Sequence, residues 1–417
     1  MKKGYLILVL SVCWDRSVFT ISGMLAFLLY GCITPFEPPV GAYNSALVID
    51  GVFTDSGEPS TVTLSRSFAL SARQGEAVKG AEVIIESDQG EQTVLREKED
   101  GVYQTNPTLF KGQAGKRYRL LVETPEGDRF ESEWELMKAA PPIGDIDFAW
   151  EERIPDDPNK PALPGIQFYL NTSDAEKNTR FYNWELITTH EFALPLAPQI
   201  RVEFGSPPFH GNDEIIFISE AEAEGYRCWR TDFSRSILIA STDNLTEDII
   251  SDFPIHFVDV KSPRLSFRYS LLIKQYAISE AYYEYLKLLE ETNETTGSIF
   301  DPTPTEVFGN LKNSDGKALP VLGYFRVAGL SEKRIFVNRD ELPLGFTTPS
   351  GPVCKIDTID LDFIDLYTEI EIEKKVLYNY YFLANPPPGE PQGFLLTDPI
   401  CTSCALNEAT NERPDFW

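Results

Sequence analysis

The feature that most constrains the fold is a regular alternation of short β-type segments and turns after residue 45. Residues typical of strands occupy 46–52, 60–65, 81–86, 93–95, 118–123 and 129–136. Between the last two segments, Pro125-Glu126-Gly127-Asp128 has the composition of a hairpin turn. Strands at this spacing, without a helical run between them, predict an antiparallel sandwich of the immunoglobulin-like or transthyretin-like kind over residues 46–138.

β-type segments return after residue 165 and predict a larger β-rich domain over residues 166–417. They lie at 166–170, 180–188, 200–203, 214–218, 236–240, 265–276, 323–327, 334–337, 369–372 and 376–382. One amphipathic helix is expected among them, since Ser279 can cap it and an apolar face follows at three- and four-residue spacing. That face comprises Ile278, Ala281, Tyr282, Tyr285, Leu288 and Leu289. The predicted fold class is therefore mainly β.

Two proline-rich segments are predicted to be irregular. Residues 139–165 contain six prolines and many charges, so we expect a linker or long surface loop there. Residues 195–213 contain Gly205-Ser206-Pro207-Pro208 and are expected to form an exposed excursion. Because rigid β scaffolds commonly present binding residues on loops, these two segments are the expected contact sites for a partner.

The start of the chain resembles a bacterial lipoprotein signal. Lys2 and Lys3 precede two short apolar runs, and the second run leads directly into Leu29-Tyr30-Gly31-Cys32. Cleavage before Cys32 would remove residues 1–31, and the Cys32 thiol would then carry the lipid. The apolar run at 18–29 is shorter than the ~20 residues that a spanning helix needs. Residues 32–45, rich in proline, would form a tether between the lipid and the first domain.

The charge of the chain excludes some partners. The sequence has 64 acidic and 37 basic residues, a formal net charge of −27. A field of this sign repels phosphate backbones, so we expect no nucleic-acid partner. It also repels anionic head groups, so the N-terminal lipid, and not a basic patch, would hold the protein to the membrane. Hydrophobic residues make up 42% of the chain, which is enough to fill cores.

Cleavage before Cys32 would remove Cys13, and lipidation would use Cys32, which leaves four of the six cysteines: Cys228, Cys354, Cys401 and Cys404. An even set outside the cytoplasm favours disulfides, and four cysteines allow three pairings. We expect Cys354, Cys401 and Cys404 to lie close together with at least one disulfide among them. A redox Cys-x-x-Cys site at 401 and 404 is disfavoured, because the motif lies in a polar, proline-flanked tail. A four-cysteine zinc site is disfavoured because only one close-spaced pair exists.

No catalytic or cofactor-binding motif is recognised. The histidines, His190, His210 and His256, are scattered, and Leu194 occupies the position where a zinc-protease helix would place its second ligand. The sequence lacks a nucleophile elbow, a phosphate-binding glycine loop and a dinucleotide fingerprint. The acidic run from Asp357 to Glu373 lacks the spacing of a calcium loop and is interpreted as solvated, with 369–373 as the wet face of a strand.

Several stretches along the chain are similar to those of one protein family. They include Leu47-Val48-Ile49-Asp50-Gly51, Val78-Lys79-Gly80-Ala81-Glu82-Val83, Val321-Leu322-Gly323-Tyr324-Phe325 and the end, Cys401 to Trp417. In these stretches the chain resembles the Bacteroidota lipoproteins grouped as domain of unknown function 4249. The resemblance implies an outer-membrane lipoprotein, often encoded beside TonB-dependent transporters. It transfers no catalytic residue, and both the periplasmic and the cell-surface face are compatible with it.

Two functions from different classes are compatible with these features. The first is a non-enzymatic binding or accessory subunit of the outer membrane, acting with a TonB-dependent transporter in nutrient uptake and needing no cofactor. The second is a hydrolase of a polymer or peptide that uses carboxylates among the 64 acidic residues. Co-purification with a transporter would support the first. Substrate turnover that is abolished by one carboxylate substitution would support the second.

Overall fold

The computed structural model describes residues 45–417 except 69–74, 156–158, 206–212, 220–226, 295–306, 318, 343–352 and 383–390. The chain divides into two units, Met1–Ser45 and Ala46–Trp417, and the strands and helices of the described residues all belong to the second. The predicted signal peptide, Cys32 and all of the tether except Ser45 lie outside the described residues. None of the helices in the described ranges combines the length and the apolarity needed to cross a bilayer.

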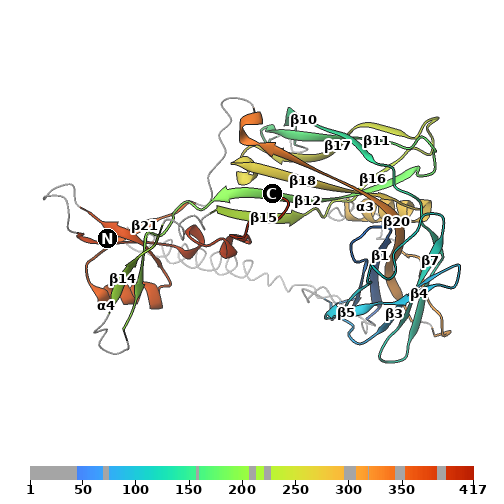
Figure 1. The fold of residues 1–417 in the computed structure, drawn as a ribbon, viewed down its shortest axis with the longest axis horizontal. Coiled ribbons are helices and arrows are strands. Elements are labelled where there is room, and N and C mark those ends of the chain that lie inside the picture. The colour runs from blue at the N-terminus through green and yellow to red at the C-terminus, as the bar shows by residue number, and fades with distance from the viewer. Residues whose placement is uncertain are drawn as a thin grey trace, which may run out of the picture. The chain divides into compact units, whose positions relative to one another are not determined.

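The longest strand of the described chain, β20 (Val321–Asn338), belongs to a nine-stranded sheet (Figure 1). Its first part pairs in parallel with β1 (Leu47–Thr54), from Val321 opposite Leu47 to Ala328 opposite Thr54. Its second part pairs antiparallel with β18 (Arg268–Ala277), beginning with Gly329 opposite Ala277. The sequence predicts two separate strands here. The structure corrects this to one strand that serves two β-sandwiches.

The change of partner within β20 depends on the absence of a side chain at Gly329. The Gly329 backbone N–H donates to the carbonyl oxygen of Lys138 at 3.0 Å, where the chain leaves the first sandwich. A Cβ atom at Gly329 would lie 2.3 Å from that same oxygen, closer than real Cβ contacts. Only glycine allows the two segments to approach this closely.

The first sandwich has the predicted β-type segments but is completed from elsewhere in the chain. One layer is β1 and β20 with β2 (Thr61–Arg66), β6 (Val102–Gln104) and β5 (Arg96–Glu99). The other has β19 (Leu311–Asn313), β8 (Arg129–Ser132), β7 (Arg117–Glu123), β3 (Glu82–Ser87) and β4 (Gln92–Val94), with β9 (Glu135–Leu136) beside β7. Phe325 and Val327 of β20 are buried in the core with Leu47, Val62 and Tyr118. Residues 46–138 alone therefore lack part of their own core.

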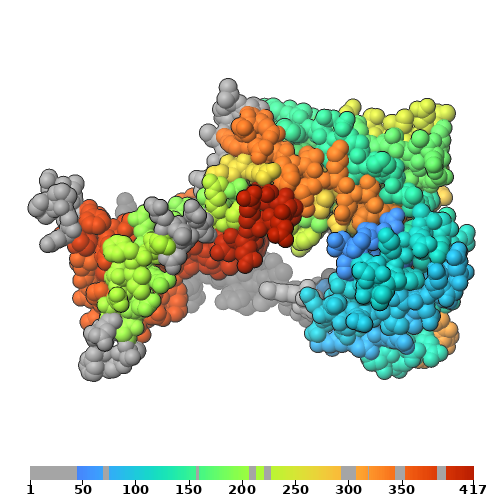
Figure 2. All heavy atoms as spheres, viewed as in Figure 1, coloured from blue at the N-terminus to red at the C-terminus, as the bar shows by residue number. Residues whose placement is uncertain are grey.

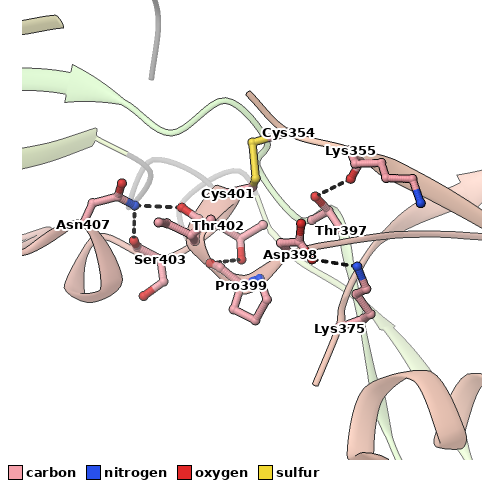
Figure 3. Close-up of a disulfide and its surroundings, with 11 residues drawn as sticks. Cys354, Lys355, Lys375, Thr397, Asp398, Pro399, Cys401, Thr402, Ser403 and Asn407 are labelled. Carbon is pink, nitrogen blue, oxygen red and sulfur yellow. Dashed lines mark hydrogen bonds and ion pairs between the residues drawn. A yellow bond between two sulfur atoms is a disulfide. The ribbon is translucent and has the colours of Figure 1, made fainter. Parts of the chain in front are cut away.

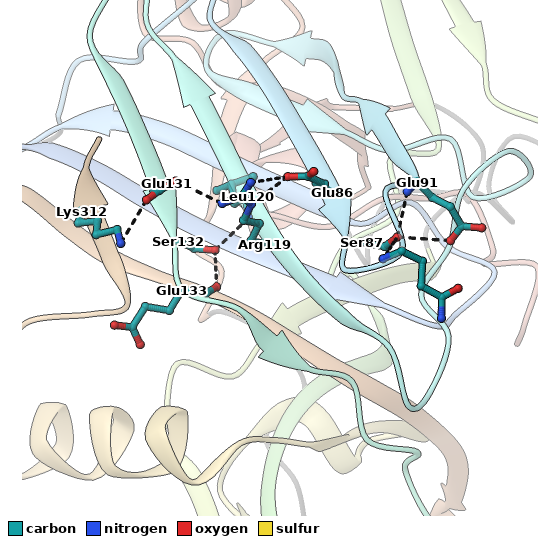
Figure 4. A network of polar contacts seen from close by, with 10 residues as sticks. Glu86, Ser87, Glu91, Arg119, Leu120, Glu131, Ser132, Glu133 and Lys312 are labelled. Atoms are coloured by element: carbon teal, nitrogen blue, oxygen red, sulfur yellow. Dashed lines mark hydrogen bonds and ion pairs between the residues drawn. The ribbon is translucent and has the colours of Figure 1, made fainter. Parts of the chain in front are cut away.

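Ion pairs on the second layer connect β19, which lies far along the chain, to the strands of residues 46–138 (Figure 4). Arg119 of β7 donates to Glu86 of β3 at 2.8 Å and to Glu131 of β8 at 3.4 Å. Lys312 of β19 reaches Glu131 from the other side at 3.2 Å. These pairs are partly exposed, so we assign them to register more than to stability.

The second sandwich places a three-stranded sheet over β12 (Phe181–Ala193), β18 and β20 (Figure 1). That sheet has the order β10 (Ile143–Arg153), β11 (Leu163–Ser173), β17 (Ile249–Asp259). The core between the two layers of the second sandwich includes Phe168, Trp184 and Leu271. The predicted linker at 139–165 is therefore wrong: its prolines flank an eleven-residue strand, β10, and the start of β11. Strands β15 (Arg227–Phe233) and β16 (Leu238–Ser241) both pair with β12.

The predicted amphipathic helix is confirmed as α3 (Glu280–Glu294). The backbone N–H of Tyr282 donates to the Ser279 hydroxyl at 3.2 Å, so Ser279 caps the helix as expected. Tyr282, Tyr285 and Leu289 lie in a cluster with the buried side chains of Tyr276 and Ala328. The apolar face thus covers the nine-stranded sheet near the point where β20 changes partner.

A third body combines two distant stretches of the chain (Figure 2). The hairpin of β13 (Ile200–Glu203) and β14 (Glu214–Phe217) packs with a sheet of order β21 (Ile356–Asp360), β23 (Gly393–Thr397), β22 (Val376–Tyr381). The predicted excursion at 195–213 thus contains β13. Helix α4 (Phe363–Tyr367) leads into a π-helical turn, η4 (Thr368–Ile372), where the sequence predicts a strand. Ile370 packs in the core but Ile372 is exposed, so the alternation there does not reflect a strand.

A buried arginine connects the two sandwiches. Arg326 of β20 is only 9% exposed, and its Nη1 donates to Asn183 of β12 at 2.8 Å. Its Nη2 bonds to Glu185, and its guanidinium lies 4.2 Å from the ring centre of Tyr276. Burial acts against ionisation of Glu185, but the charge and hydrogen bond of Arg326, together with Tyr276 and Lys274, hold the pKa of Glu185 below its ordinary value.

We predict that Phe325→Ala lowers the free energy of unfolding by ~3–5 kcal/mol, because it leaves a cavity in the core of the first sandwich. Urea denaturation monitored by circular dichroism measures the loss. The control is Leu319→Ala, an exposed residue just before β20, which should change stability by less than ~0.5 kcal/mol. Equal stability of the two variants would show that residues 46–138 do not depend on β20.

Candidate functional site

A cavity of about 470 Å³ lies among strands β10, β12, β15, β16 and β17 and the short helix η2 (Pro263–Leu265). Its polar lining side chains are Arg153, Thr188, Asp232, Ser234, Arg235, Ser236, His256 and Arg264. Its apolar lining residues are Leu186, Phe233, Leu238, Pro254, Ile255 and Phe257. A volume of this size suits a small organic molecule.

The alternation of β12 explains why the core of the second sandwich ends in this hollow. Successive side chains of a strand point to opposite faces, so Trp184, Leu186, Thr188 and His190 share one face. Trp184 and Leu186 belong to the apolar core, and Leu186 and Thr188 line the cavity. On this face of β12 the side chains change from apolar to polar between Leu186 and Thr188. The arginines of the cavity come from the neighbouring elements.

The single carboxylate among the described lining residues is fully engaged. Arg264 donates through Nη2 to one oxygen of Asp232 at 3.0 Å, and Arg230 donates through Nε to the other at 2.9 Å. Arg230 also pairs with Glu408 at 2.7 Å. Asp232 therefore neutralises charge and orients Arg264, and neither of its oxygens lacks a partner.

His256 belongs to an aromatic and hydrogen-bonded group at the cavity. Its Nε2 lies 2.8 Å from the hydroxyl oxygen of Tyr269, and the tautomer decides which group donates. The two rings are nearly parallel, with centres 6.2 Å apart. Burial, with the nearby guanidinium groups of Arg264 and Arg153, lowers the pKa of His256 to about 4. The imidazole is therefore neutral at pH 7.

His190 is buried two residues beyond Thr188 on the same face of β12. Its Nδ1 has no hydrogen-bond partner among the described residues. Burial and the guanidinium of Arg264 lower its pKa to about 4, against an opposing effect of Asp232. The third histidine, His210, lies outside the described residues.

The four distal cysteines form two disulfides: Cys228 with Cys404, and Cys354 with Cys401. The first ties β15 to the C-terminal segment, which also bridges β15 where Trp229 and Thr410 exchange backbone hydrogen bonds. The second lies beside the three-stranded sheet of the third body, next to the Lys375–Asp398 ion pair of 2.6 Å (Figure 3). Both are structural in position, and neither lines the cavity.

The acidic run is distributed over three elements: Asp357 and Asp360 lie on β21, Asp365 on α4, and Glu369 and Glu371 on η4. Asp362 caps α4 by accepting from the backbone N–H of Ile364 at 2.7 Å. Within the part of the chain that the structure describes, no three His, Cys, Asp or Glu residues are arranged to hold a metal ion.

The sequence analysis lists His256 only as one of three scattered histidines, and it does not single out the arginines of the cavity. Arg153 and Arg264 are more than 100 residues apart in the sequence. They meet Arg235 only because β10, the turn between β15 and β16, and η2 come together. The one local signal is Ser234-Arg235-Ser236, a polar turn between two β-type segments. A turn of this composition is common, so it did not stand out.

We predict that peptide mapping without reduction recovers the two disulfide-linked peptide pairs, 228 with 404 and 354 with 401. Replacing Cys354 and Cys401 together with Ser should lower the free energy of unfolding by ~2–5 kcal/mol, because the unfolded chain gains conformational freedom. Urea denaturation measures this loss. Four alkylatable thiols in the native protein would contradict the pairing.

We predict that His190 makes the protein acid-sensitive. Its pKa is about 4 in the folded chain and 6.5 in the unfolded chain, so the unfolded state binds more protons between these values. Stability is therefore lost as pH falls from 6.5 to 4, by on the order of 3 kcal/mol for this group. His190→Phe should reduce this loss while leaving stability at pH 7 similar, as measured by urea titrations at both pH values. An unchanged pH dependence would refute the assignment.

Comparisons with known proteins place this chain in a family. One solved structure, titled "Biofilm associated protein - BSP domain", is 8% identical, and the match covers 75% of this chain and 62% of that chain. Its TM-score is 0.13, so the likeness carries no argument about fold or function. No curated protein matches the chain. The family model described as "Domain of unknown function (DUF4249)" matches residues 33–334, and the chain therefore belongs to this family.

Proposed function

We propose that this protein is a lipid-anchored, non-enzymatic binding subunit of the outer membrane that acts beside a TonB-dependent transporter in nutrient uptake. The observation that carries the binding role is the cavity of the second sandwich, about 470 Å³ in volume and lined by polar side chains from several elements. The proposal of a transporter partner is supported by the resemblance of the sequence to outer-membrane lipoproteins that are often encoded beside such transporters.

The chemistry of the cavity favours binding over hydrolysis. A general base needs an available lone pair within reach of the substrate. Asp232 accepts from two arginines, and Nε2 of His256 is engaged with the hydroxyl of Tyr269. Glycoside hydrolysis usually needs two carboxylates ~5–9.5 Å apart, and Asp232 is the single carboxylate among the described lining residues. The groups are arranged to hold a ligand.

The location outside the cytoplasm is supported by two independent features. Leu29-Tyr30-Gly31-Cys32 follows an apolar run, as in lipoprotein signals. Two disulfides, Cys228–Cys404 and Cys354–Cys401, are typical of an oxidising compartment. A protein confined to a membrane surface gains from high effective concentration, so a modest contact with the transporter would be sufficient.

Exposed apolar side chains lie in or beside the two segments proposed to contact the transporter. Ile154, just after β10 and within 139–165, is 83% exposed, and Phe217, at the end of β14 and four residues beyond 195–213, is 73% exposed. Neither segment can be deleted without damage, since β10 and β13 contribute to the cores of their bodies. Single substitutions at these two positions are therefore the appropriate probes.

We predict that Cys32→Ala abolishes incorporation of a palmitate label and releases the protein from the outer membrane. Metabolic labelling followed by membrane fractionation measures both effects. Cys228→Ala, which removes a cysteine of the Cys228–Cys404 disulfide, is the control and should still be labelled. Equal labelling of wild type and Cys32→Ala would exclude the anchor.

The partner is tested by co-purification from native outer membranes. Ile154→Glu combined with Phe217→Glu should reduce the recovered transporter severalfold, because two charges would have to be buried in the interface. Leu109→Glu, on an equally exposed apolar residue of the first sandwich (79% exposed), should not. Recovery of the same transporter at the same yield from both variants would locate the contact elsewhere. Recovery of no transporter from wild type would contradict the proposed role.

A further inference from the structure

The charge of the cavity is opposite to that of the chain. The formal net charge is −27, yet the lining contains three arginines and one aspartate. The aspartate is also shared with Arg230, outside the lining. Charges inside a hollow act on a ligand at short range, whereas those on the exterior are screened over about 8 Å at physiological ionic strength. The local excess of positive charge therefore decides what binds.

The three arginines retain donors that the protein does not use. Arg235 has no hydrogen-bond or ion-pair partner among the described residues, and Arg264 uses only Nη2 on Asp232. Arg153 donates through Nη2 to the neutral amide oxygen of Gln167 at 3.3 Å, with its guanidinium 4.4 Å from the ring centre of Phe257. Guanidinium forks with unused N–H groups match carboxylate and phosphate oxygens.

The charged groups beside His256 set the sign of the local field. Beyond the effect of burial, Arg264 and Arg153 disfavour the charged imidazolium and keep the pKa near 4. A potential that disfavours a cation at this point stabilises an anion there. The hydroxyl groups of Ser234, Ser236 and Thr188 line the same hollow and can add neutral donors.

We infer that this cavity binds a small organic acid, with its anionic head on Arg153, Arg235 and Arg264 and its apolar body against Phe233 and Phe257. The volume of about 470 Å³ exceeds what an inorganic anion fills, and the aromatic and aliphatic lining suits a flat, apolar body. Carboxylate and phosphate heads share the recognition chemistry. This inference rests on the proposed function as a binding protein, whose ligand class it specifies.

The test is isothermal titration calorimetry of the full mature chain with three matched probes: phenylacetate, phenyl phosphate and the uncharged phenylacetamide. We expect at least one anion to bind at least about tenfold more tightly than phenylacetamide. The preferred anion distinguishes a carboxylic acid from a phosphate ester. In parallel, benzenesulfonate, which stays ionised at pH 4, should raise the pKa of His256 in an NMR titration.

Two variants locate the binding. Arg264→Gln should weaken the preferred anion about tenfold or more, with phenylacetamide unaffected. Arg235→Gln should weaken it severalfold and keeps the inference testable if Arg264→Gln unfolds, since Arg235 is exposed and makes no hydrogen bond or ion pair with other described residues. Arg96→Gln, an exposed arginine of β5, carries the same charge change and should have no effect.

Equal affinity for phenylacetate, phenyl phosphate and phenylacetamide, or no binding of any at millimolar concentration, would overturn the inference. Anion binding that Arg96→Gln weakens as much as Arg235→Gln would also overturn it, because the effect would then come from overall charge. The proposed function fails separately, through loss of the transporter from native membranes. An accessory subunit that retains its transporter but shows no preference for anions refutes only the ligand class.

Discussion

The architecture depends on one strand, β20, that pairs and packs in two sandwiches at once. β20 supplies Phe325 and Val327 to the core of the first and Val337 to the core of the second. Arg326 lies between them and is buried. Its guanidinium donates hydrogen bonds to Asn183 and Glu185 and lies over the ring of Tyr276, and these contacts stabilise the buried charge. Removing Glu185 would leave a buried charge without its counter-ion where the two sandwiches join. The same contact links β20 to β12, whose Thr188 lines the cavity.

Much of the local structure is predictable from the sequence because it depends on neighbours in the chain. The strands of residues 46–138 follow from alternation and turns, and α3 follows from Ser279 and its apolar face. The assignment failed at 139–165, where prolines suggested a loop. They lie at positions that do not interrupt hydrogen bonding within β10, which leaves the strand intact.

The long-range features were beyond sequence reasoning for a physical reason. Parallel pairing of β1 with β20 joins residues more than 270 positions apart, and no local pattern encodes it. The same holds for the choice between three cysteine pairings and for the meeting of Arg153, Arg235 and Arg264. The acidic composition suggests a binding surface that repels anions, whereas the cavity has an excess of positive charge. The net charge of the whole chain does not reveal this local excess.

The placement of β20 also determines the order in which the protein can mature. β1 is the first strand of the described residues to be synthesised, but β20, which pairs with it in parallel, begins more than 270 residues later. Until residues 321–338 arrive, the first sandwich has an open edge and an incomplete core, a state prone to wrong pairing. This chain therefore cannot complete its folding from the N-terminus onward. The exposed edge of β1 therefore stays without its parallel partner for most of the synthesis of the chain.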